Sequence, residues 1–257
     1  MSLNNDRLET QAEVFRADGK FRFECRHDLP CFGQCCRDIN IFLTPYDVLR
    51  LKKKLGLTSS QFLEKHIYEL GPPQVIFPVM YLKMNEEDRL QCPFVTEKGC
   101  SVYEVRPWSC RMAPVDIAGP GTYRLAFDSK KCKGLNEERE WTVAEWMRGQ
   151  EMDSYLAVED DFKNVPLLVR YTGEKSLDSV IFKIFRMAFY DTDSFIKLVT
   201  KNKFLIKEAG LDREAFLRTL KDDSQLIKSA VYWFVNTAPN KDLLKKIEKI
   251  LQTQKFR

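Results

Sequence analysis

The chain lacks the features that mark several large classes of protein. It has only two histidines in 257 residues, and no apolar run approaches the roughly 20 residues that a membrane-spanning helix requires. Its first residues, MSLNNDRLETQAEVF, have no apolar stretch of the kind found in secretion signals. The sequence therefore predicts a cytoplasmic protein without a transmembrane segment, in a compartment where thiols stay reduced.

Signatures of catalysis and of nucleic-acid binding are also missing. The net charge of +4 is mild, and lysine and arginine are interspersed with acidic residues, so the chain has no basic footprint for nucleic acid. We find no glycine-rich phosphate loop, no Ser-His-Asp set and no carboxylate pair with evident roles. The sequence thus predicts no nucleic-acid partner, leaves open whether the protein is an enzyme, and identifies no catalytic residue.

Cysteine is what the chain does have, and it is unevenly distributed. No cysteine follows residue 132, so all eight fall in the first part of the chain: Cys25, Cys31, Cys35, Cys36, Cys92, Cys100, Cys110 and Cys132. Hydrophobic residues make up 44% and charged residues 30%, which is ordinary for a folded protein of one large or two small domains. We predict a cysteine-rich metal-binding module at residues 21–140 and a helical region at residues 141–257.

Helix signals are strong in both regions. Thr44, Pro45 and Asp47 form the start of one helix, which Gly56 should end, and Thr58 begins another that should end near Gly71-Pro72-Pro73. Further helices are predicted over residues 142–160, 176–200, 212–221, 223–236 and 240–253. Short strands are predicted over 21–25, 75–84 and 122–127, with one helical turn beginning at residue 101. The expected fold class is mainly α (α+β), with short strands confined to the cysteine-rich module.

Four explanations of the eight thiols compete. Disulfides are disfavoured by the missing signal peptide, and plain burial explains a single cysteine such as Cys132 better than it explains eight. A catalytic or redox thiol has little support, because only His27 and His66 are available as a base. Metal binding by thiolates is favoured, with all eight cysteines as candidate ligands. His27 is explained equally well as an ordinary loop residue and as a metal ligand, so we leave it out of the set of candidate ligands.

The spacing of the cysteines bears on the kind of metal. Thiolates select zinc, copper(I) or iron–sulfur clusters, and zinc ribbons typically have two CxxC pairs, which this chain lacks. The adjacent Cys35 and Cys36 diverge in any regular backbone, so they reach two metal atoms more easily than one. This favours a polynuclear centre or two neighbouring centres over a single zinc ion. Eight thiols also equal two sets of four.

The same residues resemble a known family, the zinc- or iron-chelating CxxCxxCC domain, also called the YkgJ family. The resemblance covers roughly residues 21–135. It rests on GQCC (33–36), LTPYD (43–47), and CPF (92–94) followed by GCSVYEVRP (99–107) and CR (110–111). The first half departs from the family pattern, because Phe32 stands where the second cysteine belongs and Cys31 lies one residue earlier.

The resemblance implies metal chelation and says little about a reaction. Our first hypothesis is an iron–sulfur cluster with a redox or group-transfer role. The alternative is a zinc-stabilised binding module that recruits a protein partner. A weaker alternative is a protein lysine N-methylase, since some relatives of the domain look like methylases acting on flagellin, and this rests on analogy alone.

Several charged residues near these motifs have two interpretations. Arg106 and Arg111 flank Cys110 and could offset the negative charge of a thiolate centre, or Arg106 could pair with Glu104 or cap a turn. The run of lysines at 52–54 is expected on the solvated face of its helix. The last helix is amphipathic and basic, and we expect it to pack on its own domain.

Overall fold

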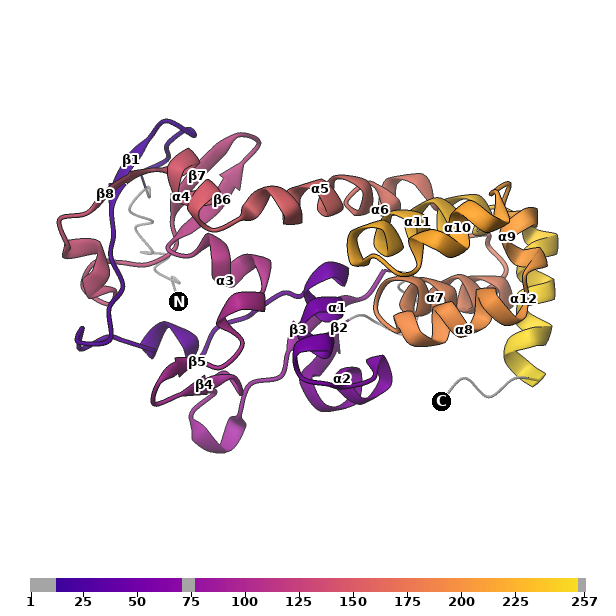
Figure 1. The fold of residues 1–257 in the computed structure, drawn as a ribbon, viewed down its shortest axis with the longest axis horizontal. Coiled ribbons are helices and arrows are strands. Elements are labelled where there is room, and N and C mark those ends of the chain that lie inside the picture. The colour runs from indigo at the N-terminus through magenta and orange to yellow at the C-terminus, as the bar shows by residue number, and fades with distance from the viewer. Residues whose placement is uncertain (1–12, 71–76, 254–257) are drawn as a thin grey trace, which may run out of the picture.

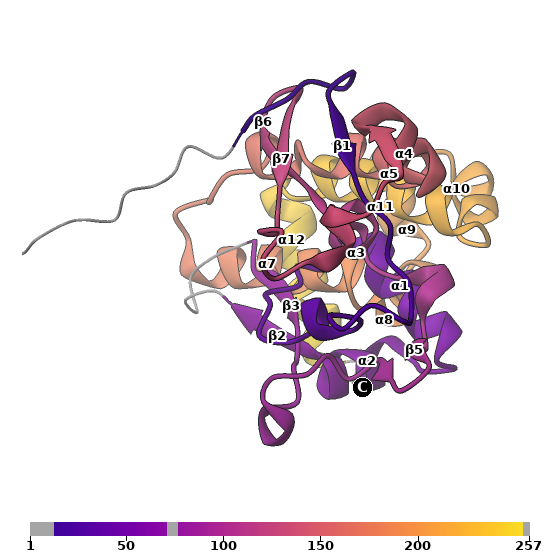
Figure 2. The same ribbon diagram turned by 90° about the vertical axis from the view of Figure 1, so that its left-hand side faces the viewer.

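Short strands and irregular loops form one half of the molecule, and helices form the other. The computed structural model describes residues 13–70 and 77–253. In Figure 1 the strands β1 and β4–β8 lie at the N-terminal end, helices α6–α12 lie at the opposite end, and α1, α2 and the β2–β3 hairpin lie between them. Helix α5 runs along one side and joins the two halves. Figure 2 shows the strand-rich end, with β1, α3 and α4 in front of the C-terminal helices.

The described strands pair into four separate two-stranded antiparallel sheets. Their bounds are β1 Lys20–Arg22 with β8 Glu140–Thr142, β2 Ile67–Leu70 with β3 Val79–Leu82, β4 Val95–Thr96 with β5 Gly99–Cys100, and β6 Val115–Gly119 with β7 Thr122–Leu125. Short 3₁₀ helices are η1 Gln34–Cys36, η2 Glu86–Asp88, η3 Tyr103–Val105 and η4 Lys133–Asn136. No sheet here is large enough to form a layer, so the loops of this half need another source of order.

Helices account for most of the regular structure. They are α1 Pro45–Lys54, α2 Ser59–His66, α3 Trp108–Met112, α4 Val143–Gly149, α5 Met152–Phe162, α6 Val165–Leu168, α7 Lys175–Phe189, α8 Thr192–Lys201, α9 Phe204–Glu208, α10 Arg213–Thr219, α11 Asp223–Thr237 and α12 Lys241–Thr253. The predicted fold class, mainly α with short strands, is confirmed. None of these helices combines the length and the apolar composition that crossing a bilayer requires.

The helix starts predicted from capping residues are confirmed. Thr44, Thr58 and Thr142 each accept a hydrogen bond from the backbone of the third helical residue, whose side chain bonds back to the threonine N–H. These reciprocal bonds satisfy N–H groups that the helix cannot pair internally. Gly56 follows α1 with φ 65°, a backbone that glycine adopts without strain.

Several predicted boundaries were wrong. The helix that begins after Thr58 ends at His66 and passes directly into β2, while the Gly71-Pro72-Pro73 stop lies outside the described residues. The helix predicted over 142–160 is two helices, α4 and α5, separated at Glu151, which has φ 56°. The helix predicted over 176–200 is also two, because the Asp191 side chain caps a new helix, α8, by accepting from Ser194 N–H.

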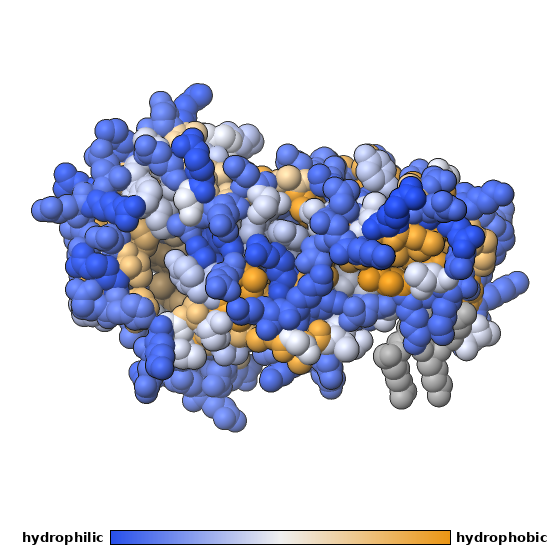
Figure 3. All heavy atoms as spheres, viewed as in Figure 1, coloured by the Kyte–Doolittle hydropathy of each residue, from blue (hydrophilic) through white to orange (hydrophobic). Residues whose placement is uncertain are grey.

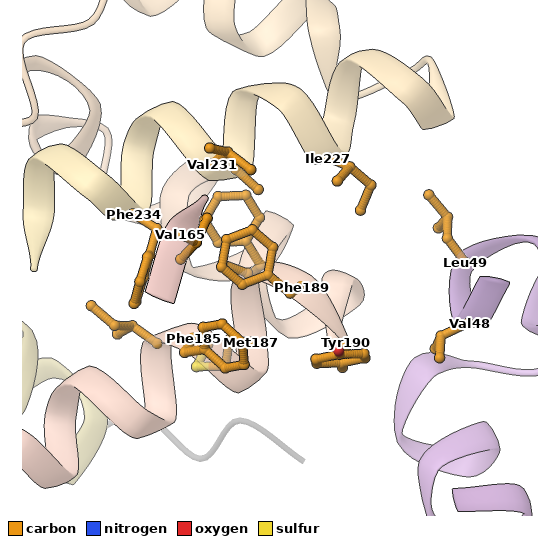
Figure 4. Close-up of a cluster of buried hydrophobic side chains, with 14 of the residues drawn as sticks. Val48, Leu49, Val165, Phe185, Met187, Phe189, Tyr190, Ile227, Val231 and Phe234 are labelled. Atoms are coloured by element: carbon orange, nitrogen blue, oxygen red, sulfur yellow. The ribbon is translucent and has the colours of Figure 1, made fainter. Parts of the chain in front are cut away.

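The main hydrophobic core joins the first helices to the C-terminal ones. Figure 4 shows Phe185 and Phe189 of α7 against Phe234 of α11, with Val48 and Leu49 of α1 facing the same cluster. The ring centroids of Phe185 and Phe189 lie 4.9 Å apart, within the range of favourable aromatic packing. The α12 side chains Leu243, Leu244 and Ile247 are buried in this core, so the last helix does pack on its own chain.

A second, smaller core lies in the strand-rich half and brings together Phe21, Met112, Val115, Val143, Trp146 and Met152. Both cores therefore include side chains from each side of residue 140. The division into a module at 21–140 and a region at 141–257 stays a prediction.

The three lysines at 52–54 were expected in solvent, and for Lys52 this was wrong. Lys52 is 5% exposed, and its ammonium donates to Asp193 Oδ1 of α8 at 2.6 Å and to Ser59 Oγ at 2.7 Å. Lys53 and Lys54 pair with Asp223 and with Glu104. The three lysines thus connect α1 to α8, α11 and η3 rather than forming one solvated face.

Candidate metal centre

Four cysteines form what we call the outer group: Cys25, Cys31, Cys35 and Cys132. Cys25 and Cys35 are exposed, and the other two are half-buried. Burial raises the pKa of the Cys25 thiol to about 11, and charge on the three other thiols acts in the same direction. Burial also raises the pKa of Cys132, with a smaller contribution from charge on Cys31 and Cys35. The four thiols are therefore close enough to repel one another when ionised.

The other four cysteines form the inner group: Cys36, Cys92, Cys100 and Cys110. Cys92 is buried and the rest are half-buried. Burial raises the pKa of Cys110 above the usual thiol range, and charge on Cys92 and Cys100 adds to this effect. The pKa of Cys36 is raised by its hydrogen bond to Cys35, by burial and by charge on Cys110 and Cys92. The electrostatic contacts thus divide the eight cysteines into two groups of four.

Cys35 and Cys36 lie where the two groups meet. They occupy η1, and their sulfur atoms share a hydrogen bond that lowers the pKa of Cys35 to about 7 while raising that of Cys36. One residue belongs to each group, in line with the expectation that neighbouring cysteines reach two metal atoms more easily than one. The carbonyl of Cys36 accepts a hydrogen bond from the N–H of Cys92 at 2.8 Å. This bond holds η1 against the segment that carries Cys92.

Backbone N–H groups point at several of these sulfurs. The N–H of Lys133 donates to Cys31 Sγ at 3.2 Å. Burial raises the pKa of Cys92, and hydrogen bonds from the N–H groups of Phe94 and Val95 act in the opposite direction. Such bonds favour an anionic sulfur, which is the form that binds metal.

A close backbone contact brings the two ends of the outer group together. The N–H of Glu24 donates to the carbonyl of Gly134 at 3.0 Å. A Cβ at Gly134 would lie 2.7 Å from Glu24 O, so only glycine fits there without a shift of the backbone. Cys25 and Cys132 lie next to these residues, and the strand pairing of β1 with β8 holds the same contact.

The hollow seen in the space-filling view belongs to this half of the molecule. Figure 3 shows a recess between hydrophilic residues, with more hydrophobic residues on its floor, in the part of the face that carries the strands. As the side chains stand, no three or more of the Cys, His, Asp and Glu residues in the described parts of the chain are gathered tightly enough to hold a metal ion. Binding therefore requires the thiols of each group to rotate toward one another.

The donor set nevertheless fits a thiolate-bound metal, as the Ser109 hydroxyl shows. Ser109 Oγ is buried without a hydrogen-bond partner. Burial raises the pKa of the neighbouring Cys110, and the Ser109 hydroxyl acts to lower it. Cys110 is the acceptor nearest to this hydroxyl, and a thiolate held by a metal would accept its hydrogen bond more strongly than a neutral thiol does.

Residues 24–133 match the sequence profile of a known family, CxxCxxCC, which is described as "Putative zinc- or iron-chelating domain". This segment contains all eight cysteines. Residues 24–133 are a CxxCxxCC domain. The predicted family is thereby confirmed, and the match supports metal binding while leaving zinc or iron open. No curated protein and no solved structure matches the chain.

Phe32 stands in place of the second cysteine of the CxxCxxCC pattern, and the structure shows its contacts. Its ring lies 4.1 Å from that of His27, centroid to centroid. It also lies near Gly99, where a Cβ would come within 3.2 Å of Phe32 Cζ. Phe32 therefore packs the loop that carries Cys31 against the β4–β5 hairpin.

The LTPYD segment of the CxxCxxCC domain positions Cys110 through Asp47. Asp47 is fully buried, and its carboxylate accepts the N–H of Thr44 at 2.9 Å and the N–H of Trp108 at 2.9 Å. One side chain thus caps two helices, α1 and α3, and α3 carries Cys110. The sequence identified Asp47 as a cap for α1; its bond to Trp108 spans 61 residues, and no local pattern indicates it.

Glu159 of α5 faces the same buried region. Its Oε1 is buried without a partner, burial raises its pKa to about 7, and charge on Asp47 adds to this while a bond from Thr44 opposes it. Asp47 is affected in the same way, because burial raises its pKa to about 6. The two carboxyls are therefore poorly able to carry two charges at once.

We expect this pair to make stability fall as the pH rises. The folded protein keeps a proton on Glu159 up to pH about 7, whereas the unfolded chain releases it near the ordinary value of 4.5. The stability that Glu159 contributes to the folded protein is thus fully present below pH 4.5 and is lost as the pH rises through 7. Relative to Glu159→Gln, the wild-type unfolding free energy should drop by about 2 kcal/mol between pH 5 and 8.

Denaturant titrations of both proteins at matched metal content measure this difference. Glu214→Gln makes the same chemical change at an exposed position of α10 and is the matched control, which should leave the unfolding free energy within about 0.5 kcal/mol of wild type. A wild-type curve parallel to that of Glu159→Gln would contradict the expectation.

The two arginines of the CxxCxxCC domain have different roles. The Arg106 guanidinium acts to lower the pKa of Cys100 against the larger effect of burial, so it lies near the inner group. It also donates to Tyr103 O at 2.6 Å, while Glu104 pairs with Lys54 instead. Arg106 therefore both offsets thiolate charge and holds the turn before α3.

Arg111, in contrast, is a buried structural cation. It is 2% exposed and donates to three backbone carbonyls, those of Glu104, Arg106 and Gln150, the last at 2.7 Å. Its guanidinium also lies 4.9 Å from the centroid of the Tyr155 ring. These bonds connect the helix that carries Cys110 to the junction between α4 and α5.

Proposed function

We propose that the CxxCxxCC domain holds two iron–sulfur centres, one in the outer group and one in the inner group, and that the protein has a redox or group-transfer role. All eight cysteines serve as ligands in this proposal. The observation that carries it is the division of the thiols into two groups of four. Four thiolates form a complete ligand set for a [2Fe–2S] or [4Fe–4S] cluster.

Exposure of the outer group supports iron–sulfur over structural zinc. Structural zinc sites are usually closed, with four ligands and no open position. Here Cys25 and Cys35 are exposed, which suits a centre that exchanges electrons with a partner at the surface. A bound cluster would supply one-electron redox chemistry.

Residues around both groups of cysteines stabilise the thiolate form that would bind a cluster. The Lys133 N–H bonded to Cys31 and the N–H groups near Cys92 stabilise anionic sulfur, and Arg106 offsets charge at the inner group. Hydrogen bonds to sulfur and burial are the main means by which a protein sets the potential of a cluster. The more buried inner group and the more exposed outer group should therefore differ in potential.

Purification without air tests the proposal. The protein should be brown, absorb visible light in the blue, bleach with dithionite, and contain iron together with acid-labile sulfide. Cys100→Ser should remove the inner centre and about half of the iron. His27→Ala, which changes a neighbouring residue outside the ligand set, is the matched control and should keep all of it.

Two results would overturn the proposal. A colourless protein with two zinc ions per chain would show the alternative, a zinc-stabilised module that recruits a protein partner. An intact fold with reduced thiols and neither zinc nor iron would exclude a metal centre of either kind.

A further inference from the structure

The adjacent cysteines are the one place where the two groups share a chain segment. Cys35 belongs to the outer group and Cys36 to the inner group, and a single peptide bond separates them. Their sulfur atoms already share a hydrogen bond. Cys35 is exposed, so a small oxidant can reach it, while Cys36 is half-buried.

We propose that Cys35 and Cys36 are an oxidation site at which a peroxide forms a disulfide between the two neighbours and so removes one ligand from each group at once. This inference rests on the proposed function, since it assumes that both groups hold metal. The oxidant is hydrogen peroxide or an organic hydroperoxide.

The chemistry balances in two steps. The Cys35 sulfur attacks one peroxide oxygen, an S–O bond forms, the O–O bond breaks, and the leaving hydroxide takes up the Cys35 thiol proton as the first water. The Cys36 sulfur then attacks the sulfenic sulfur of Cys35, an S–S bond forms, the S–O bond breaks, and the leaving hydroxide takes up the Cys36 thiol proton as the second water. In sum, two thiols and one hydrogen peroxide give one disulfide and two waters, and the two sulfurs supply the two electrons.

Backbone hydrogen bonds hold the segment that carries the pair. The N–H of Gln34 donates to Cys31 O at 3.0 Å, and the N–H of Cys92 donates to Cys36 O at 2.8 Å, so η1 is held on both sides. Any two cysteines of the same group are separated in the chain by at least a turn or a loop. Linking Cys35 to Cys36 requires no two segments to approach.

Formation of the Cys35–Cys36 disulfide leaves three thiolates in each group. The outer group keeps Cys25, Cys31 and Cys132, and the inner group keeps Cys92, Cys100 and Cys110. Three ligands hold metal less firmly than four, and the remaining position opens to water. A disulfide between neighbours departs from relaxed disulfide geometry and is correspondingly easy to reduce. A dithiol reductant should therefore reverse the change and allow both groups to reload.

Peptide mapping of the full-length, metal-loaded protein tests the inference. After one equivalent of hydrogen peroxide and alkylation of free thiols, the peptide with Cys35 and Cys36 should be unalkylated at both and lighter by two hydrogens. Metal should leave both groups together, as followed with a chromogenic chelator, and dithiothreitol should reverse the oxidation.

Two cysteine variants separate this site from general thiol oxidation. Cys35→Ser and Cys25→Ser each remove one exposed ligand of the outer group, but only the second keeps the pair. Peroxide should release metal from the inner group about tenfold more slowly in Cys35→Ser than in Cys25→Ser. Equal rates would overturn the inference.

The same mapping on the reduced, metal-free chain distinguishes the inference from the proposed function. A chain that binds no metal yet links Cys35 to Cys36 would refute the metal centres and support the oxidation site. A chain that binds metal but forms its first disulfide at another pair, or releases metal from one group alone, would overturn the inference and leave the metal centres standing.

Discussion

Stripping the metal from the reduced protein with a strong chelator should release the cysteine loops and leave α7 and α11 folded. Thiolate-bound metal contributes on the order of 10 kcal/mol to the folding of small metal domains. The loops around η1 and η4 have only short strands and few buried apolar side chains to replace it. Helices α7 and α11 instead share the aromatic core of Phe185, Phe189 and Phe234.

Hydrogen exchange measured by mass spectrometry reports on both parts in one experiment. The N–H groups of Cys92 and Lys133, which bond to Cys36 O and Cys31 Sγ, should exchange at least about 100-fold faster without metal. Amides inside α7 and α11 serve as the internal control and should keep their protection. Unchanged exchange in the loops after verified metal removal would contradict the expectation.

Arg111→Met should lower the free energy of unfolding by about 4 kcal/mol, because three backbone carbonyl groups lose the charged donor that a buried side chain gives them. The carbonyls are those of Glu104, Arg106 and Gln150, and Arg111 itself is 2% exposed. Methionine keeps the volume of the side chain, so the loss reports hydrogen bonds and charge rather than a cavity.

Denaturant unfolding at matched metal content measures this loss. Arg148→Met makes the same chemical change at an exposed position of α4 and should stay within about 0.5 kcal/mol of wild type. The inner group should also bind metal more weakly in Arg111→Met, since Arg111 holds α3 and Cys110 lies on it. A stability equal to that of Arg148→Met would show that the three carbonyls find other donors.

Local sequence signals predicted the elements whose causes are themselves local. The starts of α1, α2 and α4 follow from Thr44, Thr58 and Thr142, because a capping box involves residues only three apart. Breaks inside long helical patterns were missed. The φ of 56° at Glu151 and the capping of α8 by Asp191 depend on how the flanking helices pack.

The candidate site was predictable in composition and not in arrangement. Eight cysteines before residue 133 and the adjacent pair at 35–36 predicted thiolate metal binding and hinted at two centres. Which four cysteines share a group could not be deduced, because Cys132 joins Cys25 across more than 100 residues of chain. The sequence also placed Lys52 in solvent, although its side chain is buried and pairs with Asp193 of α8.

The sequence by itself determined the supply of thiols for a metal, the capped helix starts and the family of residues 24–133, since each depends on residue type or on short spacings. The tertiary structure alone decided the partition of the thiols, the capping of α3 by Asp47 and the burial of Lys52 and Arg111. These arise when segments far apart in the chain bury their polar groups together, and each group then requires a partner that local spacing does not reveal.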